Sequence, residues 1–230
     1  MSKIWHISDS HCLHNQIISQ ESDIVIFSGD ASNAHDPGLN ANEIDDFINW
    51  FSALPQSIKI FVPGNHDVSI WKGMIKKERF EQKGIRLLIN ESCFYNDIHF
   101  WGSPYTPRLY DHYTHWAWGL KRAEMHKVWR LIPQQVDVLI THGPPRGVLD
   151  LTDDKEKNAP VQAGDSILLR AVKDRFPIPK AHLFGHIHTE KTYYNTGILN
   201  THGIIFSNGS CAGGHNKLEL ISNGNILNIN

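Results

Sequence analysis

Five apolar runs along this 230-residue chain each end in a short segment of histidine, aspartate, asparagine or glycine. Their length and their content of Ile, Val and Phe are typical of buried β-strands. The runs are Ile4 to Ile7, Ile24 to Phe27, Ile58 to Val62, Val136 to Ile140, and Ala181 to Phe184. Open α/β sheets bind ligands beyond the carboxyl ends of their strands. We therefore predict that the five strands deliver their loops to one edge of one sheet.

The polar segments carry donor atoms that suit two metal ions. They are Asp9-Ser10-His11, Gly29-Asp30, Gly64-Asn65-His66-Asp67, Thr141-His142-Gly143 and Gly185-His186-Ile187-His188. Carboxylate, amide and neutral imidazole groups favour Mn, Fe, Zn or Ni, and the lack of cysteine argues against a closed structural zinc site. Two ions about 3.5–4 Å apart can hold a phosphoryl group and supply a hydroxide. Such a pair needs a shared anionic ligand, for which Asp30 is suited.

Two local geometries are also expected. In the Asp-x-His and His-x-His pairs, an extended backbone would place alternate side chains on one side, where both could reach one region. The glycines beside the polar residues permit tight turns and a close approach of the backbone to ions and substrate.

At these segments the chain resembles the calcineurin-like metallophosphoesterase superfamily, from Trp5 to about Gly214. The resemblance implies one metal ion bound by Asp9, His11, Asp30 and His188. It implies a second ion bound by Asp30, Asn65, His142 and His186. His66 would protonate the leaving oxygen, with Asp67 as its orienting carboxylate, and the nucleophile would be a metal-bridging hydroxide.

Two further stretches narrow the resemblance within the superfamily. They are Gly102 to Pro107 and Thr141 to Asp150. Both look like the compact branch that includes class III cyclic-nucleotide phosphodiesterases and the animal metallophosphoesterase-domain proteins. Some members of that branch have replaced the last histidine of the Gly-His-x-His segment and lost activity, whereas His188 is present here. On that point the chain looks catalytically competent.

Composition predicts one globular domain over residues 1–230, because 40% apolar content supports a sizeable core. A net charge of −2 gives no general basic footprint, so duplex nucleic acid is not a favoured partner. The densest basic run, from Lys72 to Arg79, is interrupted by Glu78 and is interpreted as a solvated helix face.

Cys12, Cys93 and Cys211 are too few and too scattered for a disulfide framework. We expect a reducing, cytoplasmic setting, and we interpret Cys12, next to His11, as a small core residue. The first polar segment is reached by position 9 without an apolar signal segment, and no stretch of about 18 apolar residues indicates a membrane span.

The expected fold is a four-layer αββα sandwich of two mixed β-sheets flanked by helices, as the family resemblance implies. Helices are predicted over Asn40 to Leu54, Gly119 to Leu131, and Gln162 to Phe176. Short strands over Arg86 to Gly102 and Gly197 to Ile229 are predicted to form the second sheet. Ser222 to Asn225 is predicted to be a hairpin turn.

Several other residues are weaker candidates for the site. Asn33, Arg108 and Arg146 lie close to the polar segments in sequence, and the arginines could hold a phosphate oxygen or simply face water. The remaining candidates are loop histidines and an aromatic-rich stretch: His14, His35, His112, His115, His215, Tyr105, Tyr110, Tyr113, Trp116 and Trp118. The aromatic side chains could stack a nucleobase, or form a flap or a homodimer interface.

The leading functional hypothesis is a phosphodiesterase or phosphomonoesterase acting on a small phosphoester, possibly a nucleotide, with Mn²⁺ as the expected metal. A metal-dependent nuclease is a second hypothesis, which requires a local basic groove and salt-sensitive binding. A non-catalytic scaffold that binds metal or nucleotide is least favoured, because all the ligand positions and His66 are occupied. Both a monomer and a homodimer fit the sequence.

Overall fold

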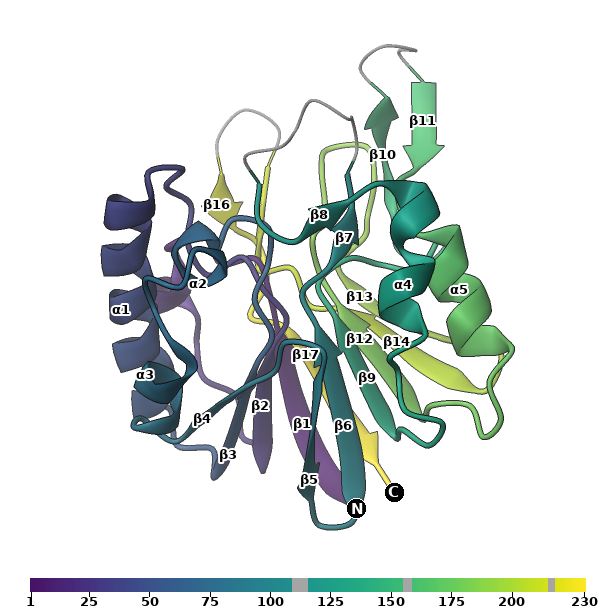
Figure 1. Cartoon of the computed structure of the whole chain (residues 1–230), viewed down its shortest axis with the longest axis horizontal. Coiled ribbons are helices and arrows are strands. Elements are labelled where there is room, and N and C mark those ends of the chain that lie inside the picture. Colours follow the sequence, from purple (N-terminus) through teal and green to yellow (C-terminus); the bar gives the residue numbers. More distant parts are fainter. Residues whose placement is uncertain (109–115, 155–158, 215–217) are drawn as a thin grey trace.

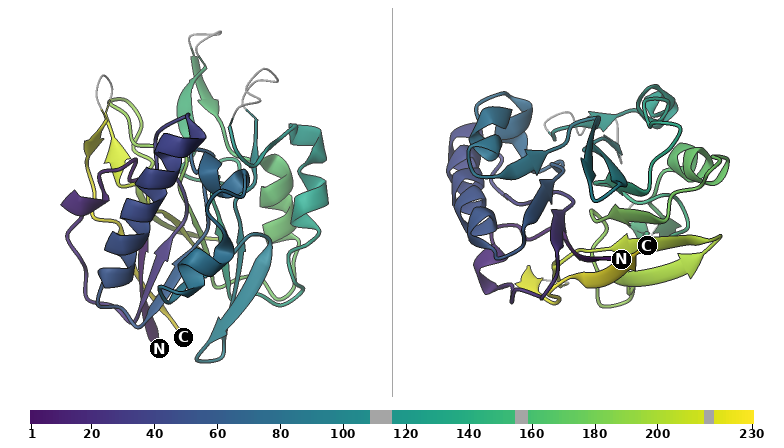
Figure 2. Two further views of the ribbon diagram at one scale, coloured as in Figure 1. Left: turned by 60° about the vertical axis from the view of Figure 1, so that its left-hand side comes forward. Right: turned by 90° about the horizontal axis from the view of Figure 1, so that it is seen from below.

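Two large β-sheets stand face to face between two groups of helices. The computed structural model describes residues 1–108, 116–154, 159–214 and 218–230. Figure 1 shows α1, α2 and α3 beside one sheet and α4 and α5 beside the other, and Figure 2 shows the same layers from below. This confirms the expected αββα sandwich.

The first sheet has five strands in the order β17-β1-β2-β3-β4. Its strands are β1 (Ser2–Ile7), β2 (Ile24–Phe27), β3 (Ile58–Phe61), β4 (Ile85–Leu87) and β17 (Asn225–Ile229). Strands β1 to β4 run parallel, whereas β17 pairs antiparallel with β1. The loops that follow β1, β2 and β3 therefore leave the sheet at the same end.

The second sheet has six strands in the order β13-β14-β12-β9-β6-β5. Its strands are β5 (Glu91–Tyr95), β6 (Ile98–Ser103), β9 (Val138–Thr141), β12 (Ala181–Phe184), β13 (Gly197–Thr201) and β14 (Ile204–Asn208). Strands β6, β9, β12 and β14 run parallel, and antiparallel β5 and β13 form the two edges. The loops after β9 and β12 also leave together.

Three pairs of short strands lie at the end of the sandwich where these loops emerge (Figure 1). They are β7 (Thr106–Pro107) with β8 (Gly119–Leu120), β10 (Leu151–Asp154) with β11 (Ala159–Gln162), and β15 (Ala212–Gly213) with β16 (Glu219–Leu220). Single 3₁₀ turns are formed by η1 (His14–Gln16) and η2 (Arg122–Glu124).

The helices are α1 (Pro37–Ala53), α2 (Val68–Trp71), α3 (Lys77–Glu81), α4 (His126–Trp129) and α5 (Ser166–Lys173). Helix α1 begins earlier than predicted because the Asp36 carboxylate accepts hydrogen bonds from the Gly38 and Leu39 amides. Helix α5 begins later than predicted because Asp165 caps it through Ile167. Both helices lie where they were predicted, although their ends differ from the predicted ends.

Apolar side chains fill the space between every pair of layers. Ile26 and Ile60 of the first sheet and Ile140 and Leu183 of the second belong to one buried cluster. Phe27, Phe47 and Phe61 fill the layer under α1, and Trp129, Leu168 and Phe206 fill the layer under α4 and α5. Each central strand is thus buried on both faces, which explains its continuous apolar run.

The prediction that five strands end at one edge of one sheet is wrong. Strands β1 to β3 belong to the first sheet, and β9 and β12 belong to the second. A strand buried on both faces has no polar face that would reveal its sheet. The predicted second sheet is confirmed for β5, β6, β13 and β14, whereas β4 and β17 pair with the first sheet instead.

Two predicted local elements also differ in the structure. Of the α-helix expected over Gly119 to Leu131, only α4 is formed. The Arg108 amide donates to the Leu120 carbonyl and holds the start of the range as β8. Ser222 to Asn225 is not a hairpin turn, because β16 and β17 pair with different strands. The indole of Trp5 binds the carbonyl of Asn223 (2.7 Å) and fixes that connection instead. In the described part of the chain, no helix has the length and apolarity needed to cross a membrane.

Candidate metal centre

The loops after β1 and β2 hold each other through their backbones. The Asp9 amide donates to the Gly29 carbonyl (2.8 Å), and the His11 amide donates to the Asp30 carbonyl (3.1 Å). Asp9, His11 and Asp30 all have positive φ, of 49°, 43° and 58°. The extended geometry predicted for the Asp-x-His pair is therefore wrong. Left-handed backbone is uncommon in residues other than glycine, and here it aims side chains at the centre of the site.

The loop after β3 is fixed by Asp67. Its carboxylate accepts five hydrogen bonds, from the amides of Asp30, Ala31, Ser32 and Gly64 and from the Ser32 hydroxyl, over 2.7–3.1 Å. Burial and the charge of Asp30 raise the pKa of Asp67 to about 6. Asp67 therefore pins the β2 and β3 loops together. The prediction that it orients the His66 ring is wrong, because its oxygens bind the loop donors.

The second sheet reaches the same place through the loops after β9 and β12. The Gly185 amide donates to the His142 carbonyl (2.9 Å) and joins these two loops. A Cβ atom at Gly185 would lie 2.0 Å from an oxygen of Asp9, so only glycine lets the β12 loop approach the β1 loop this closely. The two sheets meet at the site by this contact.

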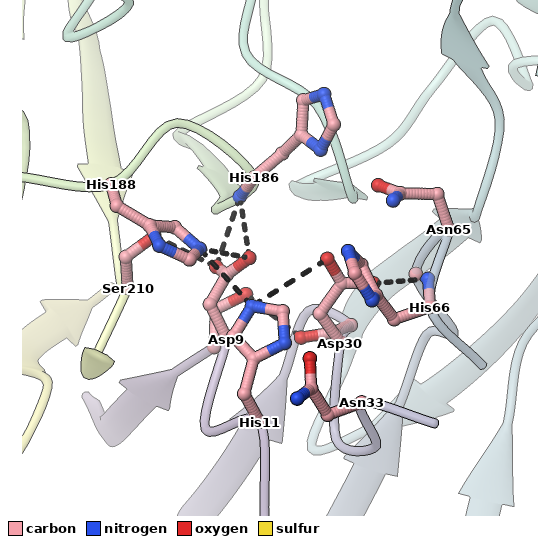
Figure 3. Close-up of polar contacts among 12 residues, drawn as sticks. Asp9, His11, Asp30, Asn33, Asn65, His66, His186, His188 and Ser210 are labelled. Carbon is pink, nitrogen blue, oxygen red and sulfur yellow. Dashed lines mark hydrogen bonds and ion pairs between the residues drawn. The ribbon is translucent and has the colours of Figure 1, made fainter. Parts of the chain in front are cut away.

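Asp9 lies at the centre of one group of side chains. Both of its oxygens accept from the His186 amide (2.9 Å), and one accepts from the Ser210 hydroxyl (2.7 Å). The Nε2 atom of His188 lies 3.3 Å from Asp9 and 3.2 Å from Nε2 of His11. Figure 3 shows these side chains turned toward one another. Asp9, His11 and His188 each offer one donor atom within 4.8 Å of the others.

Asp30 joins this group to a second one. One oxygen of Asp30 lies 3.9 Å from Nε2 of His11 and 3.2 Å from Nε2 of His142. The other oxygen accepts from the His66 amide (2.7 Å). Asp30, His142 and His186 form a further group whose donor atoms lie within 4.8 Å. Asp30 therefore stands between two clusters of donors, as a shared ligand must.

The donor atoms around His142 fit a cation. Its Nδ1 donates to the Ser28 carbonyl (2.8 Å), because a carbonyl can only accept. Its Nε2 then faces the side-chain oxygen of Asn65 (3.0 Å) and the carboxylate of Asp30 (3.2 Å). In a neutral ring this nitrogen carries only a lone pair, so a proton or a metal ion is needed among the three atoms. Neutral imidazole, amide and carboxylate are appropriate ligands for a divalent metal.

The protonation states agree with this reading. Burial lowers the pKa of His11 and of His186 to about 3, so both rings present lone pairs at neutral pH. Burial also disfavours the charged form of His142, but the Asp30 carboxylate outweighs it and raises the pKa of His142 to about 9. Burial opposes ionisation of Asp30 too, yet His142 holds the pKa of Asp30 well below its usual value. The buried carboxylates thus attract positive charge to this point.

His66 lies at the mouth of the site and is half-buried. Its ring centre is 4.8 Å from that of His11 and 5.4 Å from that of Trp116. Its Nδ1 atom has no hydrogen-bond partner among the described residues. The ring thus lies beside the donor clusters.

Several residues that support the site were not predicted. Ser210 binds Asp9, and Asn40 donates to the His66 carbonyl (2.8 Å). Asn195 donates to the His188 carbonyl (2.8 Å). A signal existed for Ser210, because Asn208-Gly209-Ser210 follows an apolar strand just as the five predicted segments do. Asn40 and Asn195 gave no comparable signal.

Among the described residues, the weaker candidates are either packed in the core or exposed at the surface. His14 is buried against Phe47 and bonded to Asp46 (3.0 Å), and Trp118 and Tyr105 pack in the core, so none of them forms a stacking surface. Asn33 and His35 are exposed near the mouth. Arg146 is exposed and donates to the Gln162 carbonyl. The candidates outside the described residues are Tyr110, His112, Tyr113, His115 and His215.

Comparison with known proteins gives consistent matches. The family model described as calcineurin-like phosphoesterase matches residues 2–190. Human metallophosphoesterase domain-containing protein 1 is 30% identical over 79% of this chain and 59% of its own length. A UPF0046 protein of Caenorhabditis elegans is 32% identical over 79% of this chain and 67% of its own length.

The chain spans about three fifths of the human relative that it matches. Among solved structures, one crystal structure superposes with a TM-score of 0.64, covers 90% of each chain and is 14% identical. At that identity the superposition shows a shared fold alone.

Proposed function

This chain belongs to the calcineurin-like phosphoesterase family of metal-dependent phosphoester hydrolases, and from that premise we propose that it is a phosphodiesterase for small phosphoesters that uses two divalent ions. The observation that carries the proposal is the position of Asp30 between two clusters of buried donor atoms. Mn²⁺ is the metal we expect, with Fe, Zn and Ni as alternatives of suitable ligand preference.

Seven residues would hold the ions. Asp9, His11, Asp30 and His188 would bind one ion, and Asp30, Asn65, His142 and His186 would bind the other. When bound, such a pair polarises the phosphoryl oxygens and lowers the pKa of a bound water. The chain prepares this chemistry by keeping His11 and His186 neutral and Asp30 ionised.

His66 has the proton-transfer role in this proposal. Water adds to phosphorus and releases one proton to solvent, the bond from phosphorus to the leaving oxygen breaks, and that oxygen takes a proton from the His66 ring, which solvent then reprotonates. The half-buried ring at the mouth is reachable by the leaving group, while the His66 amide is tied to Asp30. A general acid in this position is most important for leaving groups that are poor without protonation.

Hydrolysis by metal-stripped protein reloaded with Mn²⁺ tests the proposal. Bis-p-nitrophenyl phosphate and p-nitrophenyl phosphate are compared first, followed by 2′,3′- and 3′,5′-cyclic nucleotides. We expect metal-restored cleavage that is faster for the diester. Asp30→Asn should be inactive, and Asp174→Asn, which removes an exposed carboxylate at the end of α5 that belongs to neither donor cluster, is the matched control. A preference for the monoester would make the chain a phosphatase, and no cleavage with both ions bound would contradict hydrolysis altogether.

A further inference from the structure

A pocket of about 180 Å³ continues outward from the donor cluster of Asn65 and His186, which form part of its wall. The rest of the wall comes from β7, β8, β10 and the loops after β9 and β12. We call it the arginine pocket and define it by the side chains of Arg108, Arg122, Thr106, Trp116 and Thr152 together with the segment Ala163 to Gly164. It is the natural place for the part of a substrate that is not cleaved.

The charge of this pocket is positive. Arg108, Arg122 and His186 are the ionisable residues of its described lining, and no carboxylate is among them. Guanidinium groups stay charged at every physiological pH. Asp150 and Asp165 lie behind this lining and offset part of the Arg122 charge, while their oxygens accept from the Gly164 amide (2.9 Å) and the Trp129 indole (2.6 Å). The pocket therefore suits an anion.

Both arginines are held in place by the surrounding backbone. Arg122 donates to the carbonyls of Ala163 (2.8 Å) and Gly164 (2.9 Å), which orient its guanidinium without neutralising it. Arg108 lies over Gly119, where an added Cβ would be 3.0 Å from the Arg108 side chain. The Nε atom of Arg108 is buried and lacks an acceptor within the described part of the chain. A buried donor without a partner is costly unless a ligand supplies the acceptor.

We propose that the arginine pocket binds a second phosphate of the substrate, so that the preferred substrates are phosphodiesters carrying an additional terminal phosphate. The inference rests on the proposed function, because it assumes that the scissile phosphate lies at the donor clusters. Arginine is suited to phosphate because it donates two parallel hydrogen bonds to it. Trp116 and Pro107 supply an apolar wall for the sugar or base between the two phosphates.

A chromogenic substrate pair tests this subsite in the Mn²⁺-loaded full chain. Thymidine 5′-(p-nitrophenyl phosphate) is compared with the same compound bearing a 3′-phosphate, so that the leaving group is identical. We expect kcat/KM to be at least about tenfold higher for the 3′-phosphorylated compound, as for one charge-assisted contact. Arg108→Gln should bring the ratio close to one, and Arg108→Lys should keep part of the preference. Arg130→Gln removes an exposed arginine outside the pocket and should retain the wild-type ratio.

The possible outcomes distinguish a failure of the phosphate subsite from a failure of the proposed hydrolysis. Cleavage of both compounds with a ratio near one, or an unchanged ratio in Arg108→Gln, would overturn the subsite and leave the phosphodiesterase intact. If neither compound is cleaved, the proposed function fails, and calorimetric binding decides the subsite alone. Thymidine 3′,5′-bisphosphate should then bind at least about tenfold more tightly than thymidine 5′-phosphate, and equal affinities would overturn the inference. If Arg108→Gln does not fold, the kcat/KM ratios of the wild type and of Arg108→Lys test the subsite in its place.

Discussion

Two groups of buried histidines differ in what their ring nitrogens face. His6 and His182 lie within strands β1 and β12, and ring nitrogens of both meet hydroxyl groups: His6 meets Ser207 (2.8 Å) and Ser28 (2.9 Å), and His182 meets Thr141 (2.8 Å). His142 and His188, just beyond the strand ends, face carboxylates instead. Burial lowers the pKa of His6 and of His182 to about 3, whereas Asp30 raises the pKa of His142 to about 9.

The comparison teaches that burial alone does not distinguish a structural histidine from a candidate ligand, whereas the groups that its ring nitrogens face do. A hydroxyl can donate to or accept from a neutral ring nitrogen, whereas carboxylates and further imidazoles around a ring create a demand for a cation. Ser28 connects the two groups, since its hydroxyl binds His6 and its carbonyl accepts from His142. His6 is thus linked through Ser28 to His142.

The largest effect is expected for Asp30→Asn. Removing the charge shared by the two clusters should lower kcat/KM for bis-p-nitrophenyl phosphate by about a thousandfold or more, since several kcal/mol of metal-derived stabilisation are lost. The metal content, measured by mass spectrometry, should fall in parallel. If the variant kept both its activity and its metal, the Asp30 carboxylate would not be what separates His142 from the strand histidines.

His66→Ala should produce the next largest effect. We expect about a hundredfold slower cleavage of diesters with alkyl leaving groups and a much smaller change for nitrophenyl esters, because a good leaving group needs little protonation. Metal content should be unaffected, since the His66 amide remains bonded to Asp30. Equal losses on both types of ester would rule out the general-acid role.

Acid should destabilise the chain through the strand histidines. His6 and His182 have folded pKa values near 3, below the unfolded value of 6.5, so the unfolded chain binds more protons between these pH values. Their contribution is complete above about pH 6.5 and is lost as the pH falls toward 3. Each of the two histidines should lower the free energy of unfolding by roughly 3 kcal/mol when the pH falls from about 7.5 to about 4.5.

Urea unfolding of the metal-free protein at several pH values measures this loss. His182→Gln, which can still donate to Thr141, should reduce the pH slope of the unfolding free energy by about one proton between roughly pH 4 and 6. Its activity at neutral pH should stay close to wild type. An unchanged slope would mean that His182 is already protonated in the folded chain.

The smallest effect is expected for Asp67→Asn. An amide cannot accept all five of the hydrogen bonds that the carboxylate accepts, so we expect a loss of about 1–3 kcal/mol in the unfolding free energy. Metal should bind more weakly because the β2 and β3 loops loosen. If the variant instead reproduced the leaving-group pattern of His66→Ala with unchanged stability, Asp67 would be orienting His66 after all.

The sequence was most informative where one pattern recurred. A polar segment that follows an apolar strand predicts a candidate site residue near the strand end. This pattern identifies Asp9, Asp30, His142 and His188. The division of the strands between two sheets was not predictable, since Ile26 and Ile140 belong to equally apolar strands that pack against each other. Likewise, the left-handed backbone of Asp9 and His11 arises from loop pairing between distant segments. The role of Asp67 depends on amides brought to it by the fold.

The central claim is that Asp30 is shared by two ions, and electron paramagnetic resonance of the protein titrated with Mn²⁺ tests it most directly. Metal-stripped chain should bind two ions per molecule and develop the signal of an exchange-coupled pair. In Asp30→Asn the coupled signal should be absent, while Asp174→Asn should keep it. One ion per chain, or two ions with uncoupled signals in the wild type, would contradict the account.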